Sequence, residues 1–253
     1  MVTKIRVYKT GFVLIALGIA CFALASCGGG GETNQDLVTR FKPQYAEMRA
    51  KLQQVAEKIP ERANGQKVTQ SLSPQPQYTY GADTPANTDI MMYPHLIDPN
   101  ENLHLDQLDM AWGSSLQRAL QYTGEKSSLT TTALKNKASE SIQRTLEGGL
   151  QTRYLAVAKV LAYQPVTAVS KDSFKGGSAQ VDGYLVDLES QQILCSFSVS
   201  ARPQEHIDYK YKEGDNPTVA LARWANSSLE SNARAAFIEA LNEFCGGNFS
   251  LGK

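Results

Sequence analysis

The chain has 253 residues, with equal numbers of basic and acidic side chains and a formal net charge of zero. That length is enough for one or two domains, each with a buried core. The balanced charge, with no basic patch and no long run of one sign, argues against a nucleic-acid-binding protein and against a polyelectrolyte partner.

The N-terminal residues have the order of a secretory leader. Lys4, Arg6 and Lys9 come first with no acid among them, and an apolar run follows over residues 11–24. Basic residues, a short apolar run and then small residues are typical of a secretory signal peptide. The run is shorter than the roughly 20 residues of a membrane-spanning helix, so a plain membrane anchor is the less favoured alternative.

The apolar run ends on Leu24, Ala25, Ser26 and Cys27, and four glycines follow. These residues resemble, at every position, the lipobox of bacterial lipoproteins. The resemblance implies that the Cys27 thiol receives a diacylglycerol group, that signal peptidase II cuts before Cys27, and that the new amine is often acylated too. Two or three acyl chains at one residue are expected to anchor the chain stably, because each buried methylene contributes about 0.8 kcal/mol.

Gly28 follows the cysteine, at the position where an aspartate tends to retain lipoproteins of enteric bacteria in the inner membrane. The resemblance therefore implies an outer-membrane lipoprotein that faces the periplasm. Removal of residues 1–26 would leave 227 of the 253 residues and, without the three basic residues of the leader, a net charge of −3.

Cys195 and Cys245 are the cysteines left once Cys21 is removed with the leader and Cys27 is acylated. The periplasm is oxidising, so these two thiols are expected to pair in a disulfide that contributes at most roughly 4 kcal/mol. The alternative is two buried thiols, which behave as small hydrophobic side chains.

Residues 27–34 are interpreted as a flexible Gly-rich tether and residues 35–60 as an amphipathic helix. Regular helix is expected to begin near Pro43, since proline suits a first turn, and to end before Pro60. The apolar stripe is expected to pack on its own domain, with a coiled-coil stub for a partner as the alternative. The stripe alternates spacings of three and four residues: Val38, Phe41, Tyr45, Met48, Leu52, Val55 and Ile59.

Residues 61–104 are rich in proline and polar side chains, which predicts an irregular or extended segment. A short edge strand is expected within it at residues 90–93. An α+β domain is predicted over 105–250. It opens with helices over 106–123 and 131–146, and glycines are expected to end both helices: Gly124, Gly148 and Gly149.

Strands are predicted over 154–163, 179–188 and 193–201, with a weaker fourth strand over 206–212. The first is apolar on both faces, as in a central strand. The last helix begins at Pro217, and a break is expected at the capping-box spacing that starts at Ser227. The predicted fold class is therefore α+β, a three- to four-stranded, largely antiparallel sheet packed against helices.

The fourth strand and the disulfide compete with each other. If the last helix returns directly after 193–201, it brings Cys245 beside Cys195, within the roughly 7 Å between Cα atoms that a disulfide allows. A further antiparallel strand over 206–212 would start the helix at the opposite end and separate the cysteines, unless the helix folded back at Ser227.

Motifs of catalysis are not found in the sequence: it has no metalloprotease histidine pattern, nucleophile elbow, phosphate loop or dinucleotide-binding glycines. Asp98, Asn100 and Asn102 match the first ligands of an EF-hand, but Leu103 stands where that loop needs glycine, so no metal is predicted. A transition-metal site formed by His95, Asp98 and His104 is an equally weak option.

The sequence thus predicts a lipid-anchored periplasmic lipoprotein of the cell envelope, acting as a non-catalytic binding or assembly module without a cofactor. Its expected partners are the membrane, through Cys27, and an envelope protein or peptidoglycan. Two alternatives stay open: an enzyme whose site joins scattered residues such as His104 and His206, and a small-ligand carrier with an apolar cavity. Five tyrosines are candidates for an exposed aromatic binding face: Tyr78, Tyr80, Tyr93, Tyr209 and Tyr211.

Overall fold

The computed structural model describes residues 33–80, 86–101, 108, 110, 112–124, 138–212, 214 and 216–252. By its contacts the chain divides into two units, Met1–Gly31 and Glu32–Lys253. Every described helix and strand belongs to the second unit. The predicted leader, residues 1–26, lies outside the described residues, as does the predicted tether up to residue 32.

A mixed four-stranded sheet lies at the centre of the Glu32–Lys253 unit, with strand order β2-β3-β4-β5. β2 pairs with β3 in parallel, whereas β3–β4 and β4–β5 are antiparallel pairs. The sheet is formed by β2 Thr88–Met92, β3 Tyr154–Ser170, β4 Ser173–Asp187 and β5 Gln192–Ala201. A separate parallel pair joins β1 Gln77–Thr79 to β6 Asn248–Ser250. The predicted α+β class is confirmed, and β2 is an edge strand where one was expected.

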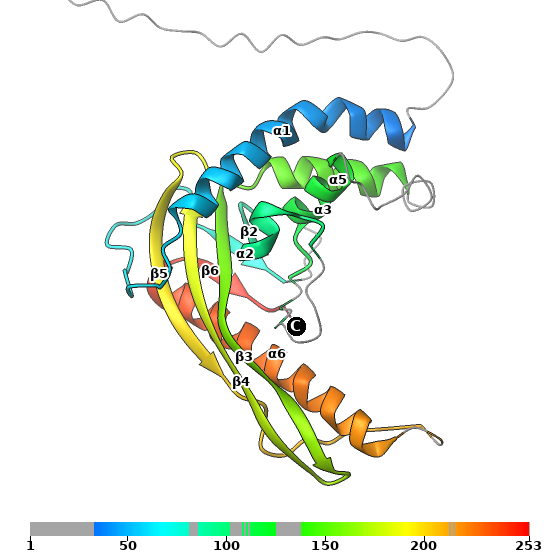
Figure 1. The fold of residues 1–253 in the computed structure, drawn as a ribbon. Coiled ribbons are helices and arrows are strands. Elements are labelled where there is room, and N and C mark those ends of the chain that lie inside the picture. Colours follow the sequence, from blue (N-terminus) through cyan, green and yellow to red (C-terminus); the bar gives the residue numbers. More distant parts are fainter. Residues whose placement is uncertain are drawn as a thin grey trace, which may run out of the picture. The chain divides into compact units, whose positions relative to one another are not determined.

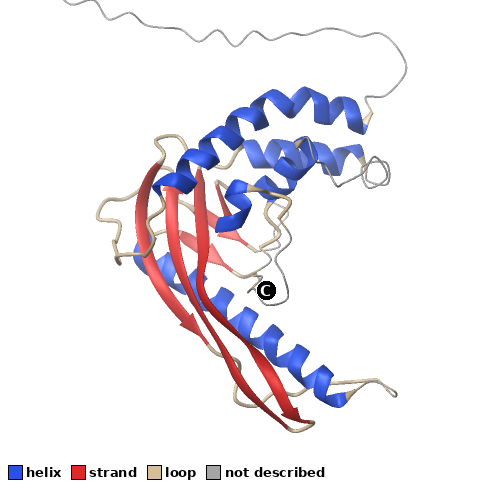
Figure 2. Cartoon of the chain, viewed as in Figure 1, coloured by secondary structure: helices blue, strands red, loops and turns tan. Residues whose placement is uncertain are grey.

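Helices cover both faces of this sheet (Figures 1 and 2). Alternate residues of β3 enter two different cores: Ala156 and Ala158 pack on the side of α6, and Leu155 and Val157 pack on the side of α1, α3 and α5. The two alanines leave room for the close approach of a helix. The helices are α1 Asn34–Lys58, α2 Tyr93–Ile97, α3 Ser115–Thr123, α5 Ser139–Leu150 and α6 Pro217–Cys245.

α1 begins at Asn34, so the prediction that regular helix starts near Pro43 is wrong. Thr33 caps the helix, because its hydroxyl accepts a hydrogen bond from the Asp36 N–H at 3.2 Å while its own N–H donates to the Asp36 carboxylate at 3.2 Å. This capping box starts the helix, and burial of its first apolar residues offsets the roughly 3 kcal/mol that a proline inside a helix costs.

The apolar stripe of α1 packs inside the unit, against α2, α3 and α5, as expected. Tyr45 lies at its middle and donates a hydrogen bond from its hydroxyl to the Leu146 carbonyl of α5 at 2.5 Å. Each residue of the predicted stripe is at most 9% exposed: Val38, Phe41, Tyr45, Met48, Leu52, Val55 and Ile59. The stripe is therefore part of the core and is not available for a coiled coil.

The helix predicted over 106–123 is shorter than expected, because α3 begins only after Ser114. The Ser114 hydroxyl accepts a hydrogen bond from the Gln117 N–H at 2.9 Å, and Gly113 before it has a φ of +63°. The left-handed backbone at Gly113 turns the chain just before the Ser114 cap, so α3 cannot begin earlier. Trp112 is therefore buried outside the helix. Residues 106, 107, 109 and 111 of the predicted range lie outside the described residues.

α5 runs through Gly148 and Gly149, so the prediction that these glycines end the helix is wrong. Gly149 is buried where α5 crosses α3 and α1. A Cβ atom there would lie 2.4 Å from the Tyr45 hydroxyl and 3.3 Å from the Leu116 Cα, so the glycine permits close packing. Residues 131–137 of the predicted helix lie outside the described residues.

β3 and β4 extend well beyond the last residue of β5, Ala201, which pairs with Ala179. We call this extension, residues 163–178, the distal hairpin. Residues 175–177, which precede the strand predicted over 179–188, lie inside β4, where Gly177 has a φ of +86° and packs closely on Pro203. The hairpin turns instead at residues 171–172.

The fourth strand predicted over 206–212 is not formed, and these residues are an irregular link between β5 and α6. The outer edge of β5 is already bonded, since the Ser196 N–H donates to the Gln66 carbonyl at 2.9 Å. The link is held by side chains instead: the Tyr209 hydroxyl donates to the Lys171 carbonyl at 2.5 Å.

α6 is one continuous helix from Pro217 to Cys245, so the break predicted at Ser227 is wrong. The Ser228 hydroxyl accepts a hydrogen bond from the Gln204 N–H at 3.0 Å and thus holds the link to the helix. The buried face of α6, with Leu229 near its middle, requires regular helix through this point. Among the described residues, no helix combines the length and the apolar character needed to cross a bilayer.

Candidate interaction site

The residues of the predicted processing site, Leu24, Ala25, Ser26 and Cys27, lie outside the described residues. Five residues lie between Cys27 and Thr33, the cap of α1, so six residue-to-residue steps join the two. At about 3.6 Å per residue at most, they span no more than roughly 22 Å in any conformation.

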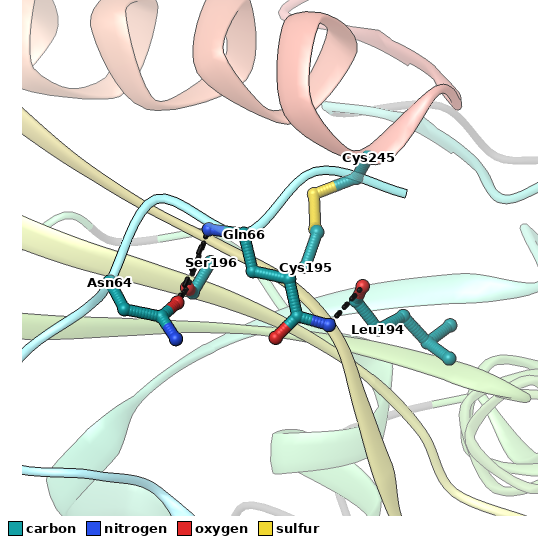
Figure 3. The surroundings of a disulfide bond; sticks show 6 residues. All are labelled: Asn64, Gln66, Leu194, Cys195, Ser196 and Cys245. Atoms are coloured by element: carbon teal, nitrogen blue, oxygen red, sulfur yellow. Dashed lines mark hydrogen bonds between the residues drawn. A yellow bond between two sulfur atoms is a disulfide. The ribbon is translucent and has the colours of Figure 1, made fainter. Parts of the chain in front are cut away.

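Cys195 and Cys245 are joined by a disulfide, with 5.5 Å between their Cα atoms (Figure 3). Both cysteines are fully buried, one on β5 and the other in the last turn of α6. α6 returns directly along the sheet because no strand intervenes after β5, which is the topology that the disulfide requires. The bond is consistent with the pairing expected from the sequence.

A row of polar residues crosses the middle of the sheet. Lys159, Asp182 and Ser198 are register partners on β3, β4 and β5. The chain between α1 and β1 meets this row, and we call residues 60–68 the crossing segment. Lys159 Nζ donates to two carbonyls of that segment at 2.9 and 3.1 Å, and the Asp182 carboxylate accepts from the Ala63 N–H at 2.6 Å. The row therefore fastens the crossing segment to the sheet.

Asp182 also accepts a hydrogen bond from the hydroxyl of Ser198, an exposed residue. Because its hydroxyl lies beside a buried carboxylate, Ser198 is a candidate nucleophile. The carboxylate is, however, saturated by structural partners: the Ala63 N–H, the Tyr184 hydroxyl at 3.5 Å and Arg62 Nε at 3.6 Å. Its oxygens are committed to the crossing segment and to the sheet, which is a structural arrangement.

The crossing segment continues round the edge of β5 to the disulfide (Figure 3). The Ser196 hydroxyl donates to Asn64 Oδ1 at 2.6 Å, and the Val68 N–H donates to the Phe244 carbonyl at 2.9 Å. Phe244 precedes Cys245, so the last turn of α6 is held to β5 by the disulfide and also through the crossing segment.

A second buried carboxylate, Asp89 of β2, lies at the start of α3. It accepts hydrogen bonds from the Leu116 N–H at 2.7 Å and from the Ile90 N–H at 2.8 Å. Burial raises the pKa of the Asp89 carboxyl above its ordinary value. Since the first N–H groups of a helix need acceptors, Asp89 positions α3 against the sheet.

The two described histidines, His95 and His206, lie on separate elements. His95 is buried on α2 with its Nε2 3.1 Å from the Glu101 carbonyl, and His206 is exposed on the link after β5. His104 lies outside the described residues, as do Asn102 and Leu103. Within the described ranges, no three His, Cys, Asp or Glu side chains are placed to share a metal ion.

The distal hairpin is held firmly on α6 by Asn226. Its Oδ1 accepts hydrogen bonds from the Val166 N–H at 2.8 Å and from the Tyr163 hydroxyl at 3.3 Å. Its Nδ2 donates to the Val166 carbonyl at 3.3 Å. The Asn226 amide thus satisfies both main-chain polar groups of Val166, at a point where β3 is an edge strand. The hairpin and the start of α6 form one end of the sheet (Figure 1).

Exposed large apolar side chains gather at this end. Of the five described ones, four belong to the hairpin, the link and the start of α6: Val169 (62% exposed), Tyr211 (53%), Val219 (55%) and Trp224 (46%). We call these four residues the tip patch. The fifth, Ile97 (58%), lies at the end of α2.

Direct contacts join the three segments that carry the tip patch. The Tyr209 and Tyr211 rings stack with centroids 5.8 Å apart, and the Tyr209 hydroxyl bonds the Lys171 carbonyl in the hairpin turn. Trp224 Nε1 donates to the Lys210 carbonyl at 3.3 Å. These contacts hold the hairpin, the link and the start of α6 together at this end, and the tip patch is the candidate interaction site.

The five tyrosines predicted to form one exposed aromatic face do not lie together. Tyr78 is buried and donates to the Trp112 carbonyl at 2.9 Å, whereas Tyr209 and Tyr211 lie at the tip. Trp224 was not among the predicted residues. Its position off the apolar stripe of α6, between Leu221 and Ala225 of that stripe, is the pattern that could have revealed it.

No protein-family model matches the sequence, and comparisons with curated proteins and with solved structures returned no match.

Proposed function

We propose that this chain is a lipid-anchored lipoprotein of the bacterial cell envelope, and that its Glu32–Lys253 unit is a non-catalytic binding or assembly module. The anchor is Cys27, which receives its lipid at the lipobox before the leader is removed. The protein is located at the outer membrane and faces the periplasm. The partner is an envelope component, either a protein or peptidoglycan.

The observation that carries this proposal is the run Leu24, Ala25, Ser26 and Cys27 directly after a basic start and a short apolar stretch. Two features support it. A buried disulfide suits an oxidising compartment. The tip patch supplies a surface of the kind that marks interaction sites.

Acyl labelling in cells tests the anchor. Cys27→Ala is expected to abolish incorporation of a labelled fatty acid and to leave the precursor uncut. Cys21→Ala is the matched control, because it removes a cysteine from the same leader without touching the lipobox, and it should be labelled normally. Normal processing and labelling of Cys27→Ala would show that the lipobox assignment is wrong.

Cross-linking in intact cells followed by pull-down tests the binding role. A specific envelope protein or a peptidoglycan fragment is expected with the wild-type chain, and its yield should fall when Tyr211 and Trp224 are both replaced by serine. Recovery of the same material by the wild-type and the doubly substituted chain would count against the tip patch as the site.

A further inference from the structure

We propose that Asn64 is a modification site, at which the side-chain amide closes a ring with the main-chain nitrogen of Gly65, loses ammonia and becomes aspartate or isoaspartate. The sequence contains a single Asn-Gly pair, and that pair lies in the crossing segment. Glycine favours the ring closure because it has no side chain to hinder the approach of its nitrogen. The inference depends neither on acylation of Cys27 nor on the tip patch.

The reaction balances with water as the only co-reactant. The Gly65 nitrogen attacks Cγ of Asn64 and gives up its proton, and Oδ1 takes the negative charge of the tetrahedral intermediate. When this intermediate collapses, the amide nitrogen leaves as ammonia and a five-membered succinimide remains. Water then opens the succinimide at either carbonyl. One opening gives ordinary aspartate, and the other gives isoaspartate, which has an additional methylene in the main chain.

Two hydrogen bonds prepare the Asn64 carbonyl for this attack. The Ser196 hydroxyl donates to Oδ1 at 2.6 Å, and the Gln66 N–H donates to it at 3.2 Å (Figure 3). Because a main-chain N–H can only donate, the atom that faces Gln66 is the oxygen of the amide. Donors aimed at an oxygen that gains negative charge stabilise the intermediate more than they stabilise the starting amide.

The attacking nitrogen and the leaving nitrogen are both unengaged. Among the described residues, neither the Gly65 N–H nor Nδ2 of Asn64 has a hydrogen-bond partner, so the reaction breaks no bond of either group. Both residues are exposed, which admits water and lets ammonia leave. Gly65 has a φ of +74°, and a Cβ atom there would meet no atom within 4 Å, so the ring has room to form.

Two asparagines of α6 are held in a different way. Nδ2 of Asn226 donates to the Val166 and Ala222 carbonyls, and Nδ2 of Asn242 donates to the Phe249 carbonyl. The residue after each of them is part of the helix, so the main-chain nitrogen that would attack is fixed in regular structure. Both asparagines are expected to stay intact, and they serve as internal controls.

Isoaspartate at position 64 would loosen the crossing segment at the edge of β5. The Ser196 N–H donates to the Gln66 carbonyl at 2.9 Å, two residues after Asn64. The additional methylene shifts Gln66 along the strand edge, so this hydrogen bond and the bonds to the side chain at position 64 cannot all be kept. Ordinary aspartate keeps them, because a carboxylate oxygen accepts from the same two donors.

Peptide mapping of the purified full chain, incubated in water enriched in heavy oxygen, tests the inference. Asn64 is expected to gain the mass of an amide-to-acid change together with the heavy oxygen, while Asn226 and Asn242 stay unchanged. Isoaspartate is expected to accept a labelled methyl group from isoaspartyl methyltransferase. The folded chain should react at least about threefold faster than the chain unfolded in guanidinium chloride, since only folding brings the Ser196 hydroxyl to Oδ1.

Ser196→Ala and Ser198→Ala are the matched variants. Ser196→Ala removes the hydroxyl donor and should slow the reaction by about threefold or more. Ser198→Ala removes a hydroxyl two residues along the same strand that bonds Asp182, so it should react like the wild type. Hydrogen exchange at the Ser196 amide should be faster in the isoaspartate fraction and unchanged in Asn64→Asp.

Three results would overturn the inference: an intact Asn64 after prolonged incubation, a slower reaction in the folded than in the unfolded chain, or a rate in Ser196→Ala as high as in the wild type. Unchanged exchange at the Ser196 amide in the isoaspartate fraction would overturn the proposed effect on β5. The acyl-labelling and pull-down experiments probe other residues, so a failure of the proposed function and a failure of this modification are distinguishable.

Discussion

Cys195 and Cys245 are 50 residues apart in the sequence, yet their Cα atoms lie 5.5 Å apart between β5 and α6. This proximity follows from the chain path: β5 leads into an irregular link, and α6 returns along the full length of the sheet. The disulfide then joins the first half of β5 to the end of α6, and the crossing segment binds both at the same place.

The first prediction concerns this disulfide. Replacing Cys195 and Cys245 together by alanine is expected to lower the free energy of unfolding by about 2–4 kcal/mol, because the bond restricts the unfolded chain. Urea denaturation checks this value. Reduction of the wild-type protein should destabilise it similarly and leave the double variant unchanged. A double variant as stable as the oxidised wild type would contradict the prediction.

The second prediction uses two adjacent glycines of α5. Gly149→Ala is expected to destabilise the protein by about 1–3 kcal/mol, because a Cβ atom there would lie 2.4 Å from the Tyr45 hydroxyl. Gly148→Ala is the control, since no atom lies within 4 Å of a Cβ atom at that position. It is expected to stabilise the helix by about 0.5–1 kcal/mol.

Thermal and urea unfolding of the two glycine variants decide this comparison. Opposite signs for the two changes are expected. Stabilisation at both positions would mean that helix propensity, and not the packing of α5 on α1, sets the stability there.

The third prediction concerns the polar row under the crossing segment. Asp182→Ala is expected to cost about 3 kcal/mol, since it leaves the Ala63 N–H without its acceptor in the interior. Hydrogen exchange at the Ala63 amide should become much faster. Asp172→Ala, at the exposed turn of the distal hairpin, should change stability by less than about 0.5 kcal/mol. Unchanged protection of Ala63 in Asp182→Ala would refute the assigned contact.

The fourth prediction is a loss of stability in alkali. Burial raises the pKa of Tyr184 from 10.0 to about 12 and raises the pKa values of Tyr45 and Tyr78 as well. Above pH 10 these hydroxyls keep their protons in the folded chain and lose them in the unfolded chain, so stability is full below pH 10 and falls as the pH rises further.

Spectrophotometric titration with circular dichroism follows both events. Part of the tyrosine ionisation is expected to coincide with the loss of folded structure. If all the tyrosines ionised near pH 10 while the circular dichroism stayed native, the burial of these hydroxyls would be contradicted.

Local patterns predicted the elements whose periodicity is strong. The stripe of α1, the doubly apolar start of β3, the β4–β5 hairpin and the long C-terminal helix were all placed within a few residues. Predictions based on single residues were less successful. Pro43, Gly149 and Ser227 were each expected to begin, end or break a helix, and in each case the packing of neighbouring residues in the core outweighs the local preference.

The tip patch illustrates what a linear pattern leaves out. Val169, Tyr211 and Trp224 lie on three different segments, and only the pairing of β3 with β4 and the return of α6 bring them to one end. The crossing segment is similar, because its residues were predicted as irregular chain and its partners Lys159, Asp182 and Ser198 come from three strands.

The sequence by itself determined the α+β class, the main helices and strands, and the predictions of a processing site at Cys27 and of a disulfide between the two remaining cysteines. These depend on residue type and on short-range spacing, which can be read along the chain. Only the tertiary structure decided between a fourth strand and a direct return of α6. That choice depends on which strand edge is already occupied, and here the main chain of the crossing segment bonds the outer edge of β5 at Ser196.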